Sequence, residues 1–134
     1  KYHVQPVIAV DKLSSFYGQS LRSPGIKKIP SQDNLLWRVE LKKLPDNIDE
    51  FRCSSGYFSE YHACSLSEIA PIINRKFQTI TYWGLNKKEL SEFMEKSKPF
   101  GIDRIVPIGR SMEFSLVWDG FDLIRVLSRA YEIR

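Results

Sequence analysis

Hydrophobic and polar positions alternate in several short stretches of the chain, and this alternation predicts strands. The clearest case is 35–41, where Trp37, Val39 and Leu41 are separated by the charged residues Arg38 and Glu40. A period of two is typical of a strand with one buried face. Further strands are predicted where aromatic and β-branched residues cluster, at 56–62, 78–84 and 103–109.

The clearest helix start follows the strand predicted at 78–84. Asn86 and Glu89 have the spacing of a capping box, in which each side chain bonds the other residue's backbone N–H. The apolar residues after them recur at helical spacing until Pro99 and Gly101, which end the helix. The sequence therefore predicts a strand followed directly by an amphipathic helix.

Three other helices have weaker signals. Ser65 and Glu68 form a possible capping box for a helix that would contain Pro71, an unfavourable residue inside a helix. A last helix is predicted at 120–131, and a short one at 11–21.

The order of strand, helix, strand, helix and strand from residue 51 onward is typical of parallel pairing with crossover helices. We therefore predict an α/β fold, with a βαβαβ unit, a mostly parallel sheet and a final helix over 51–134. Residues 1–50 are interpreted as an irregular peripheral segment with one strand. The 134 residues are expected to form a single domain or a fragment of one, and the first residue, Lys1, is consistent with a piece of a longer protein.

The composition argues against two classes of function, nucleic-acid binding and membrane spanning. The formal net charge of +4 comes from 20 basic and 16 acidic residues that are scattered along the chain, so no nucleic-acid partner is predicted. No apolar run approaches the roughly 18 residues that a membrane-spanning helix needs. The hydrophobic content of 43% is enough to furnish a core.

Potential metal and thiol ligands are few. Cys53 and Cys64 are the only cysteines and are not arranged as Cys-x-x-Cys, so they are expected to be reduced thiols in a cytoplasmic protein. His3 and His62 are too far apart in the sequence, and too few, for a zinc site. We therefore predict no metal.

The part of the chain from about residue 50 onward carries a family resemblance. The segment Gly101-Ile-Asp-Arg-Ile-Val-Pro-Ile-Gly109, followed by Trp118-Asp-Gly120 and Leu127-Ser-Arg129, resembles the end of LuxC-type acyl-CoA reductases. The Gln78-Thr79 pair resembles the same family, and the likeness covers about residues 50–134. These reductases are similar to aldehyde dehydrogenases, so the resemblance implies the part of a catalytic domain that follows the nucleophilic cysteine.

The resemblance also implies an activity. In this family a cysteine takes the acyl group from coenzyme A or a related thioester, and NADPH supplies the hydride that releases an aldehyde. A thiolate suits this chemistry because it is both a nucleophile and a leaving group. The chain has no Gly-x-Gly-x-x-Gly motif, so the implied protein would hold NADPH elsewhere, and the chain alone is expected to be inactive. The family architecture includes an oligomerisation element, so a homo-oligomer is also implied.

Two residues are candidates for positions near the reacting groups. The resemblance places the nucleophile upstream of this sequence, and Cys53, in Arg52-Cys-Ser-Ser55, is the alternative candidate. Its structural alternative is a thiol at the start of a strand. Glu40 is a candidate for the carboxylate that aldehyde dehydrogenases place on the nicotinamide ribose, or else a solvent-facing residue in an alternating strand.

Five residues of the signature segments are candidates for the substrate entrance. Arg104 and Arg110 could hold a phosphate of coenzyme A, or could pair with carboxylates such as Asp103 or Glu113. The resemblance assigns the other three residues, which form the Trp-Asp-Gly segment, to a loop at the active-site mouth or at a subunit contact. The structural alternative is a helix cap at the aspartate and a turn at the glycine. These three residues are Trp118, Asp119 and Gly120.

A different class of function stays open. The aromatic residues of the predicted strands could stack on bases in a small basic α/β binding module. They are not interleaved with Lys or Arg, so core packing is the preferred interpretation. A non-catalytic binding or oligomerisation module is the alternative function.

Overall fold

The structure is a computed structural model that describes residues 4–31 and 33–134, and it is a mixed α/β protein with small sheets. The chain divides into two compact units, Lys1–Ile72 and Ile73–Arg134. This division differs from the one expected within a single domain or fragment, between an irregular part over 1–50 and a regular part over 51–134. In the described part of the chain, no helix has the length and apolar character needed to cross a membrane.

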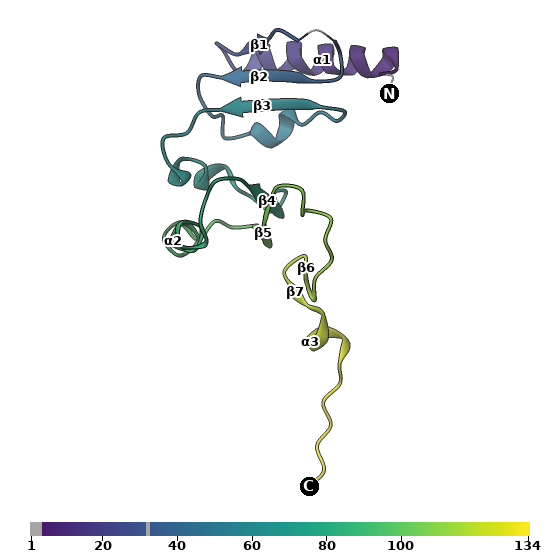
Figure 1. Cartoon of the computed structure of the whole chain (residues 1–134), viewed down its shortest axis with the longest axis vertical. Coiled ribbons are helices and arrows are strands. Elements are labelled where there is room, and N and C mark those ends of the chain that lie inside the picture. Colours follow the sequence, from purple (N-terminus) through teal and green to yellow (C-terminus); the bar gives the residue numbers. More distant parts are fainter. Residues whose placement is uncertain (1–3, 32) are drawn as a thin grey trace. The chain divides into compact units, whose positions relative to one another are not determined.

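The first unit is built on a sheet of three strands in the order β1 (Lys27–Ile29), β2 (Trp37–Leu41) and β3 (Tyr57–Tyr61). β1 is antiparallel to β2, whereas β2 and β3 are parallel and their arrows point the same way in Figure 1. A 3-10 helix, Ile48–Phe51, lies between β2 and β3 in the sequence. This sheet carries most of the buried core of the unit.

The alternation predicted for 35–41 is confirmed. Trp37, Val39 and Leu41 are buried and form a cluster with Tyr57 of the neighbouring strand. The Trp37 and Tyr57 rings stack with centroids 6.5 Å apart. Residues 1–50 are therefore not a peripheral segment, since β2 supplies the centre of the core.

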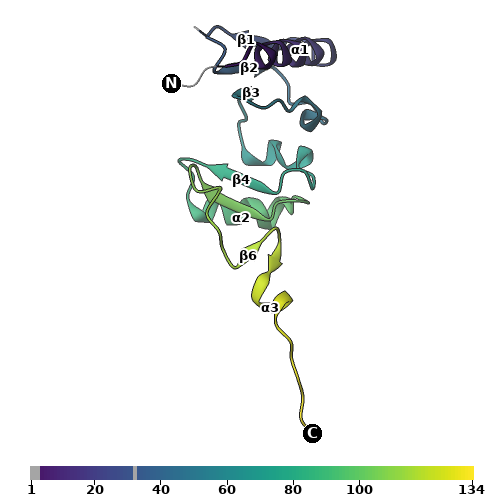
Figure 2. The ribbon, with the colours of Figure 1, turned by 90° about the vertical axis from the view of Figure 1, so that its right-hand side faces the viewer.

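The helix α1 (Pro6–Arg22) covers one face of this sheet (Figures 1 and 2), and its Phe16 ring meets Trp37 edge-on at 6.4 Å. It is longer than the helix predicted at 11–21, because Pro6 stands at a first-turn position where a missing N–H costs nothing. Its large apolar side chains recur every three or four residues on the exposed side of the helix. These are Val7, Val10, Leu13, Tyr17 and Leu21.

The side of α1 that faces the sheet carries two buried polar side chains in addition to Phe16. Lys12 is fully buried, and its Nζ donates hydrogen bonds to the backbone oxygens of Asn34 at 2.6 Å and Leu35 at 3.1 Å. Burying an ammonium group is costly unless it is hydrogen-bonded, and these carbonyls lie just before β2. Lys12 therefore ties the helix to the start of the central strand.

A second buried polar group on α1 reaches β3. The Tyr57 hydroxyl donates to Oε1 of the fully buried Gln19 at 2.6 Å, and Gln19 Nε2 donates to the Ser59 hydroxyl at 3.0 Å. Burial, and secondarily the neighbouring Cys53, raise the pKa of Tyr57 to about 12. The phenol therefore stays neutral and remains a donor throughout the neutral pH range.

Tyr57→Phe is expected to lower the free energy of unfolding by about 1–3 kcal/mol, because Gln19 Oε1 loses its donor in a buried site. The raised pKa of Tyr57 means that its contribution is complete below the ordinary value of 10.0 and is lost as the pH rises through about 12. Urea denaturation at pH 7 and pH 11 measures both effects. The control, Tyr131→Phe, removes a hydroxyl from a side chain that is 89% exposed and should change nothing.

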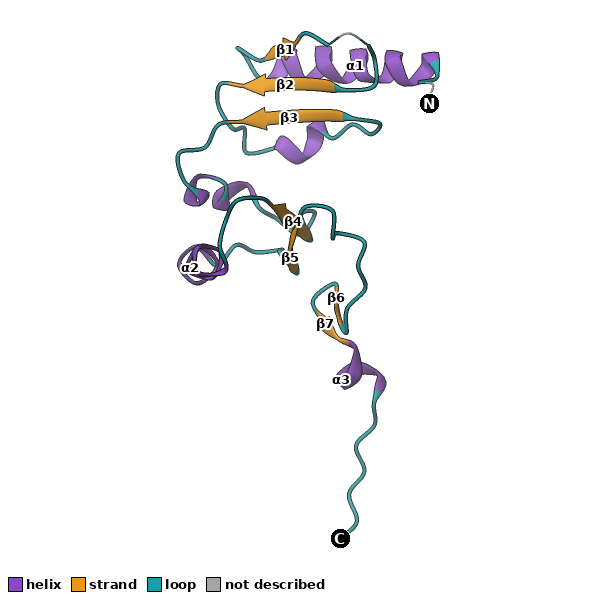
Figure 3. Ribbon diagram, viewed as in Figure 1, coloured by secondary structure: helices purple, strands orange, loops and turns teal. Residues whose placement is uncertain are grey.

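The second unit begins with a parallel βαβ arrangement of β4 (Thr79–Tyr82), α2 (Lys87–Ser97) and β5 (Arg104–Pro107). The predicted capping box is confirmed, because Asn86 Oδ1 accepts from Glu89 N at 2.9 Å and Glu89 Oε2 accepts from Asn86 N at 2.8 Å. Figure 3 shows α2 and the two strands by colour.

The last predicted helix is wrong in most of its length. A hairpin of β6 (Val117–Trp118) and β7 (Phe121–Asp122) comes first, and α3 spans only Leu123–Leu127. Asp119 and Gly120 have left-handed φ angles of +49° and +79°, so they form the hairpin turn. The carboxylate of Asp122, rather than that of Asp119, accepts the N–H of Arg125 and caps the helix.

The helix predicted from Ser65 is replaced by two short 3-10 helices, Leu66–Glu68 and Ala70–Ile72. The Ser65 side chain makes no capping bond, and Glu68 instead accepts from the Cys64 N–H at 3.0 Å. Pro71 has no N–H to continue an α-helical ladder, which explains the change.

The predicted single βαβαβ sheet is also corrected. β3 lies in the sheet of the first unit beside β2, whereas β4 and β5 pair in a sheet of the second unit. Two of the strand pairs are parallel and two are antiparallel in the described residues. The βαβ unit of β4, α2 and β5 is present, but β3 is not part of the same sheet.

Candidate functional site

The two signature segments of the second unit contact each other. Asp103 precedes β5, and its carboxylate lies against Gly120, where a Cβ atom would come within 2.8 Å of Asp103 Oδ1. The Arg104 guanidinium lies over the Trp118 ring, 4.7 Å from its centroid. Residues that are 14 or more positions apart in the sequence are thus held together by close packing and a cation–π contact.

Arg104 also holds the loop that joins the two segments. Its two terminal nitrogens donate to the backbone oxygens of Ser111 at 3.2 Å and Glu113 at 2.8 Å. Trp118 in turn stacks on Phe114 with a centroid distance of 5.4 Å. The guanidinium is therefore engaged in positioning the loop.

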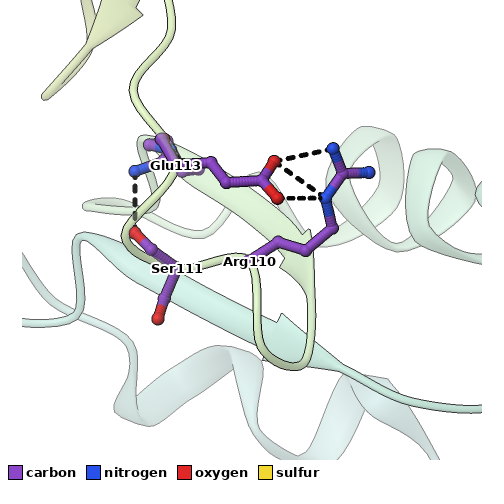
Figure 4. A network of polar contacts seen from close by, with 4 residues as sticks. Arg110, Ser111 and Glu113 are labelled. Carbon is purple, nitrogen blue, oxygen red and sulfur yellow. Dashed lines mark hydrogen bonds and ion pairs between the residues drawn. The ribbon is translucent and has the colours of Figure 1, made fainter.

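Arg110 is engaged as well. Its Nε lies 2.8 Å from both carboxylate oxygens of Glu113, and its Nη2 lies 2.6 Å from Oε2 (Figure 4). The hydrogen bond to Arg110 lowers the pKa of Glu113 below its ordinary value, and the same contact raises the pKa of Arg110. The pairing of Arg110 with Glu113 expected as an alternative is confirmed. Both groups are exposed, so the pair stabilises the loop only modestly.

These arginines line an open cavity of about 420 Å³ together with Glu113 and Phe114. A phosphate bound there would have to compete with the Glu113 carboxylate for Arg110 and with two backbone carbonyls for Arg104. The structure therefore favours a positioning role for both side chains.

A second cavity, of about 580 Å³, lies where the signature segments meet and is lined by Asp103, Asp119 and Gly120. Arg75, Lys98 and Phe100, none of which was predicted as a site residue, also line it. We call it the Arg75 cavity. The Arg75 guanidinium lies 4.7 Å from the centroid of the Phe100 ring.

Gly101 positions one wall of the Arg75 cavity. Its φ of +122° is accessible mainly to glycine, and a Cβ would lie 2.4 Å from the backbone C and O atoms of Asn74. The segment after α2 therefore packs directly on the turn that carries Arg75. The sequence indicated this glycine as a helix stop and as the first residue of a signature segment, but did not reveal its contact with Asn74.

Glu40 and Cys53 belong to the first unit. Glu40 is half-buried in β2, in register with Lys27 of β1 and Glu60 of β3. On the same face Arg38 binds Glu60 through two hydrogen bonds of 2.6 and 2.8 Å, which lower the pKa of Glu60. Cys53 is half-buried and packs against the core cluster.

The start of α2 does not offer a pyrophosphate site. Gly84 is the single glycine in the connection from β4 to α2, so a glycine-rich phosphate loop is missing there. The Asn86 side chain already occupies the N–H of Glu89 at the start of the helix. A pyrophosphate would need that helix end free. Across residues 4–31 and 33–134, no three His, Cys, Asp or Glu side chains gather as metal ligands, and His3 lies outside the described residues.

Comparison with family models, with curated proteins and with solved structures finds no match to this chain. Function is therefore inferred from the signature residues, their contacts and the surfaces around them.

Proposed function

We propose that this chain is the C-terminal part of an NADPH-dependent fatty acyl-CoA reductase of the LuxC type, which reduces an acyl thioester to an aldehyde through a cysteine thioester. The observation that carries the proposal is the contact between Gly101-Ile-Asp-Arg104 and Trp118-Asp-Gly120, the segments on which the resemblance rests. Within that enzyme the second unit forms part of the catalytic domain's wall and substrate entrance.

Exposed apolar surface supports a role within a larger body. The C-terminal stretch exposes more apolar side chains than an isolated domain normally tolerates. Apart from Phe121, those that are more than half exposed are Met112, Phe114, Leu116, Ile124, Val126, Leu127, Tyr131 and Ile133. The outward apolar stripe of α1 is a second surface of this kind. Both surfaces are expected to be covered by other parts of the reductase.

The start of α2 is not free to hold the pyrophosphate of NADPH. The sites for the pyrophosphate and the nicotinamide, and the nucleophilic cysteine, are therefore assigned to other parts of the reductase. When bound there, NADPH would supply the hydride that converts the enzyme thioester to the aldehyde. The natural polypeptide should consequently be several times heavier than 15.6 kDa. An antibody raised against this chain, used on extracts of the source cells, measures that mass. A natural product of about this size would contradict the proposal.

Cys53→Ser in the longer reductase is expected to leave its activity within about twofold, because the half-buried Cys53 packs against the buried cluster of the first sheet. Acyl-CoA-dependent oxidation of NADPH measures this. Cys64→Ser, at an exposed thiol, is the matched control. Loss of activity in the Cys53 variant alone, with its fold intact by circular dichroism, would make Cys53 the nucleophile.

The second candidate is a non-catalytic binding or oligomerisation module, which the outward apolar stripe of α1 favours. In that case the natural protein is short and the isolated chain self-associates. Light scattering of the chain with Val10→Glu and Tyr17→Glu discriminates the two: dissociation of a stable oligomer by these changes supports the module. Steeply salt-dependent binding of single-stranded nucleic acid in a filter assay would instead indicate the base-stacking alternative.

A further inference from the structure

The Arg75 cavity contains two cationic side chains that take no part in the contacts between the signature segments. Arg75 and Lys98 are exposed, and no ion pair is present for either of them in the described part of the chain. Arg75 contacts only the face of the Phe100 ring among the interactions described for it. This differs from Arg104 and Arg110, whose donors are occupied. The cavity is thus where an anionic group finds donors that no carboxylate already holds.

The same cavity exposes two aromatic rings. Phe100 is 64% exposed and Phe121 is 62% exposed, and both line the cavity. The volume of about 580 Å³ lies within the usual range for small-molecule sites, roughly 300–1,000 Å³. An exposed aromatic ring beside a cation is a good surface for a planar base, because every base has a π-face.

The remaining polar groups of the cavity restrict the ligand further. Asp103 and Asp119 are hydrogen-bond acceptors when ionised, so they suit amino and hydroxyl donors. They also disfavour a phosphate in their immediate neighbourhood, which leaves Arg75 and Lys98 for that group. Gln78 offers both a donor and an acceptor. Planar ring, amino or hydroxyl donors and a phosphate together describe a phosphorylated nucleoside with an amino group on its base.

We propose that the Arg75 cavity binds a phosphorylated adenosine, with the base on Phe100 and the phosphate on Arg75 and Lys98. This inference rests on the proposed function for the source of the ligand, which is the 3′-phosphoadenosine end of coenzyme A or the 2′-phosphoadenosine end of NADPH. The shared chemistry is the phosphorylated adenosine. The phosphate position distinguishes the two sources.

The test is a titration of the ¹⁵N-labelled 134-residue chain with adenosine 3′,5′-bisphosphate, followed by amide chemical shifts. The expected result is saturable shifts centred on Arg75, Phe100 and Asp119. A parallel titration with adenosine 2′,5′-bisphosphate identifies the source, since tighter binding of one isomer assigns the cavity to coenzyme A or to NADPH. Inorganic phosphate at the same concentrations should produce no saturable shift at these residues.

Substitutions make the test specific. Arg75→Gln and Phe100→Leu should each weaken binding by about tenfold, because one removes the cation and the other the stacking ring. Lys96→Gln, at an exposed lysine of α2 that pairs with Glu92, and Phe58→Leu, at an exposed phenylalanine of β3, are the matched controls and should bind normally. A dispersed amide spectrum for each variant shows that it is folded.

Absence of saturable shifts with both bisphosphates would overturn the inference, as would equal shifts with inorganic phosphate or unchanged binding in the Arg75 and Phe100 variants. The result is separable from the proposed function. If the longer polypeptide reduces acyl-CoA and the chain binds neither bisphosphate, the cavity inference alone fails. If the chain binds and the longer polypeptide has no reductase activity, the proposed function alone fails.

Discussion

Gly101→Ala is expected to lower the free energy of unfolding by about 3 kcal/mol or more, because the new Cβ meets backbone that cannot move aside. It would lie 2.4 Å from the Asn74 carbonyl group and 2.6 Å from the Arg75 nitrogen, at a φ of +122°. The wall of the Arg75 cavity would be displaced with it. Urea denaturation and hydrogen exchange of the β4 and β5 amides measure the loss.

The matched control for Gly101 is Gly84→Ala. Gly84 also has a positive φ, +76°, but a Cβ there has nothing within 4 Å. It should therefore cost only the backbone strain, about 1 kcal/mol. If both variants lose the same free energy of unfolding, then the close approach of Gly101 to Asn74 and Arg75 does not explain the effect of Gly101→Ala.

Lys12→Ala is expected to lower the free energy of unfolding by about 3 kcal/mol, the second large effect. The change removes a fully buried side chain and leaves the oxygens of Asn34 and Leu35 without their donor. Lys12→Met keeps most of the side-chain volume and should cost less, about 1–2 kcal/mol. Urea denaturation monitored by tryptophan fluorescence reports both, since Trp37 follows this loop directly.

Lys43→Ala, at an exposed lysine, is the control and should stay within about 0.5 kcal/mol of the parent chain. If Lys12→Ala behaves like Lys43→Ala, then the ammonium group does not tie α1 to the start of β2. If Lys12→Met is more stable than the parent chain, then the desolvation penalty of the buried ammonium group exceeds the stabilisation from its two hydrogen bonds.

Local signals predicted the elements whose stabilising partners are close in the sequence. The Asn86 capping box, the alternation around Trp37 and the Arg110–Glu113 pair all depend on residues a few positions apart, and all are present. The sequence predicted Asp119 as the cap of the last helix, whereas Asp122 is the cap, because the two residues have the same side chain. Only the left-handed φ of Asp119 distinguishes the turn from the cap.

Distant partners explain most of what the sequence did not reveal. Lys12 and Gln19 point toward the sheet because their hydrogen-bond partners lie 22 to 40 residues away in the sequence. The rule that the apolar side of a helix is buried would instead turn the outward apolar stripe of α1 toward the sheet. The pairing of β3 with β2 is likewise non-local. Arg75, Lys98 and Phe100 have no motif of their own, so their shared cavity emerges only from the fold.

We propose that this chain is part of an acyl-CoA reductase, and the activity of the natural polypeptide, captured with an antibody against residues 1–134, tests this. The measurement is oxidation of NADPH, followed by its absorbance, with and without a long-chain acyl-CoA. We expect oxidation of NADPH that requires the acyl-CoA and yields the aldehyde. A captured polypeptide that is intact and folded but oxidises no NADPH in the presence of acyl-CoA would contradict it.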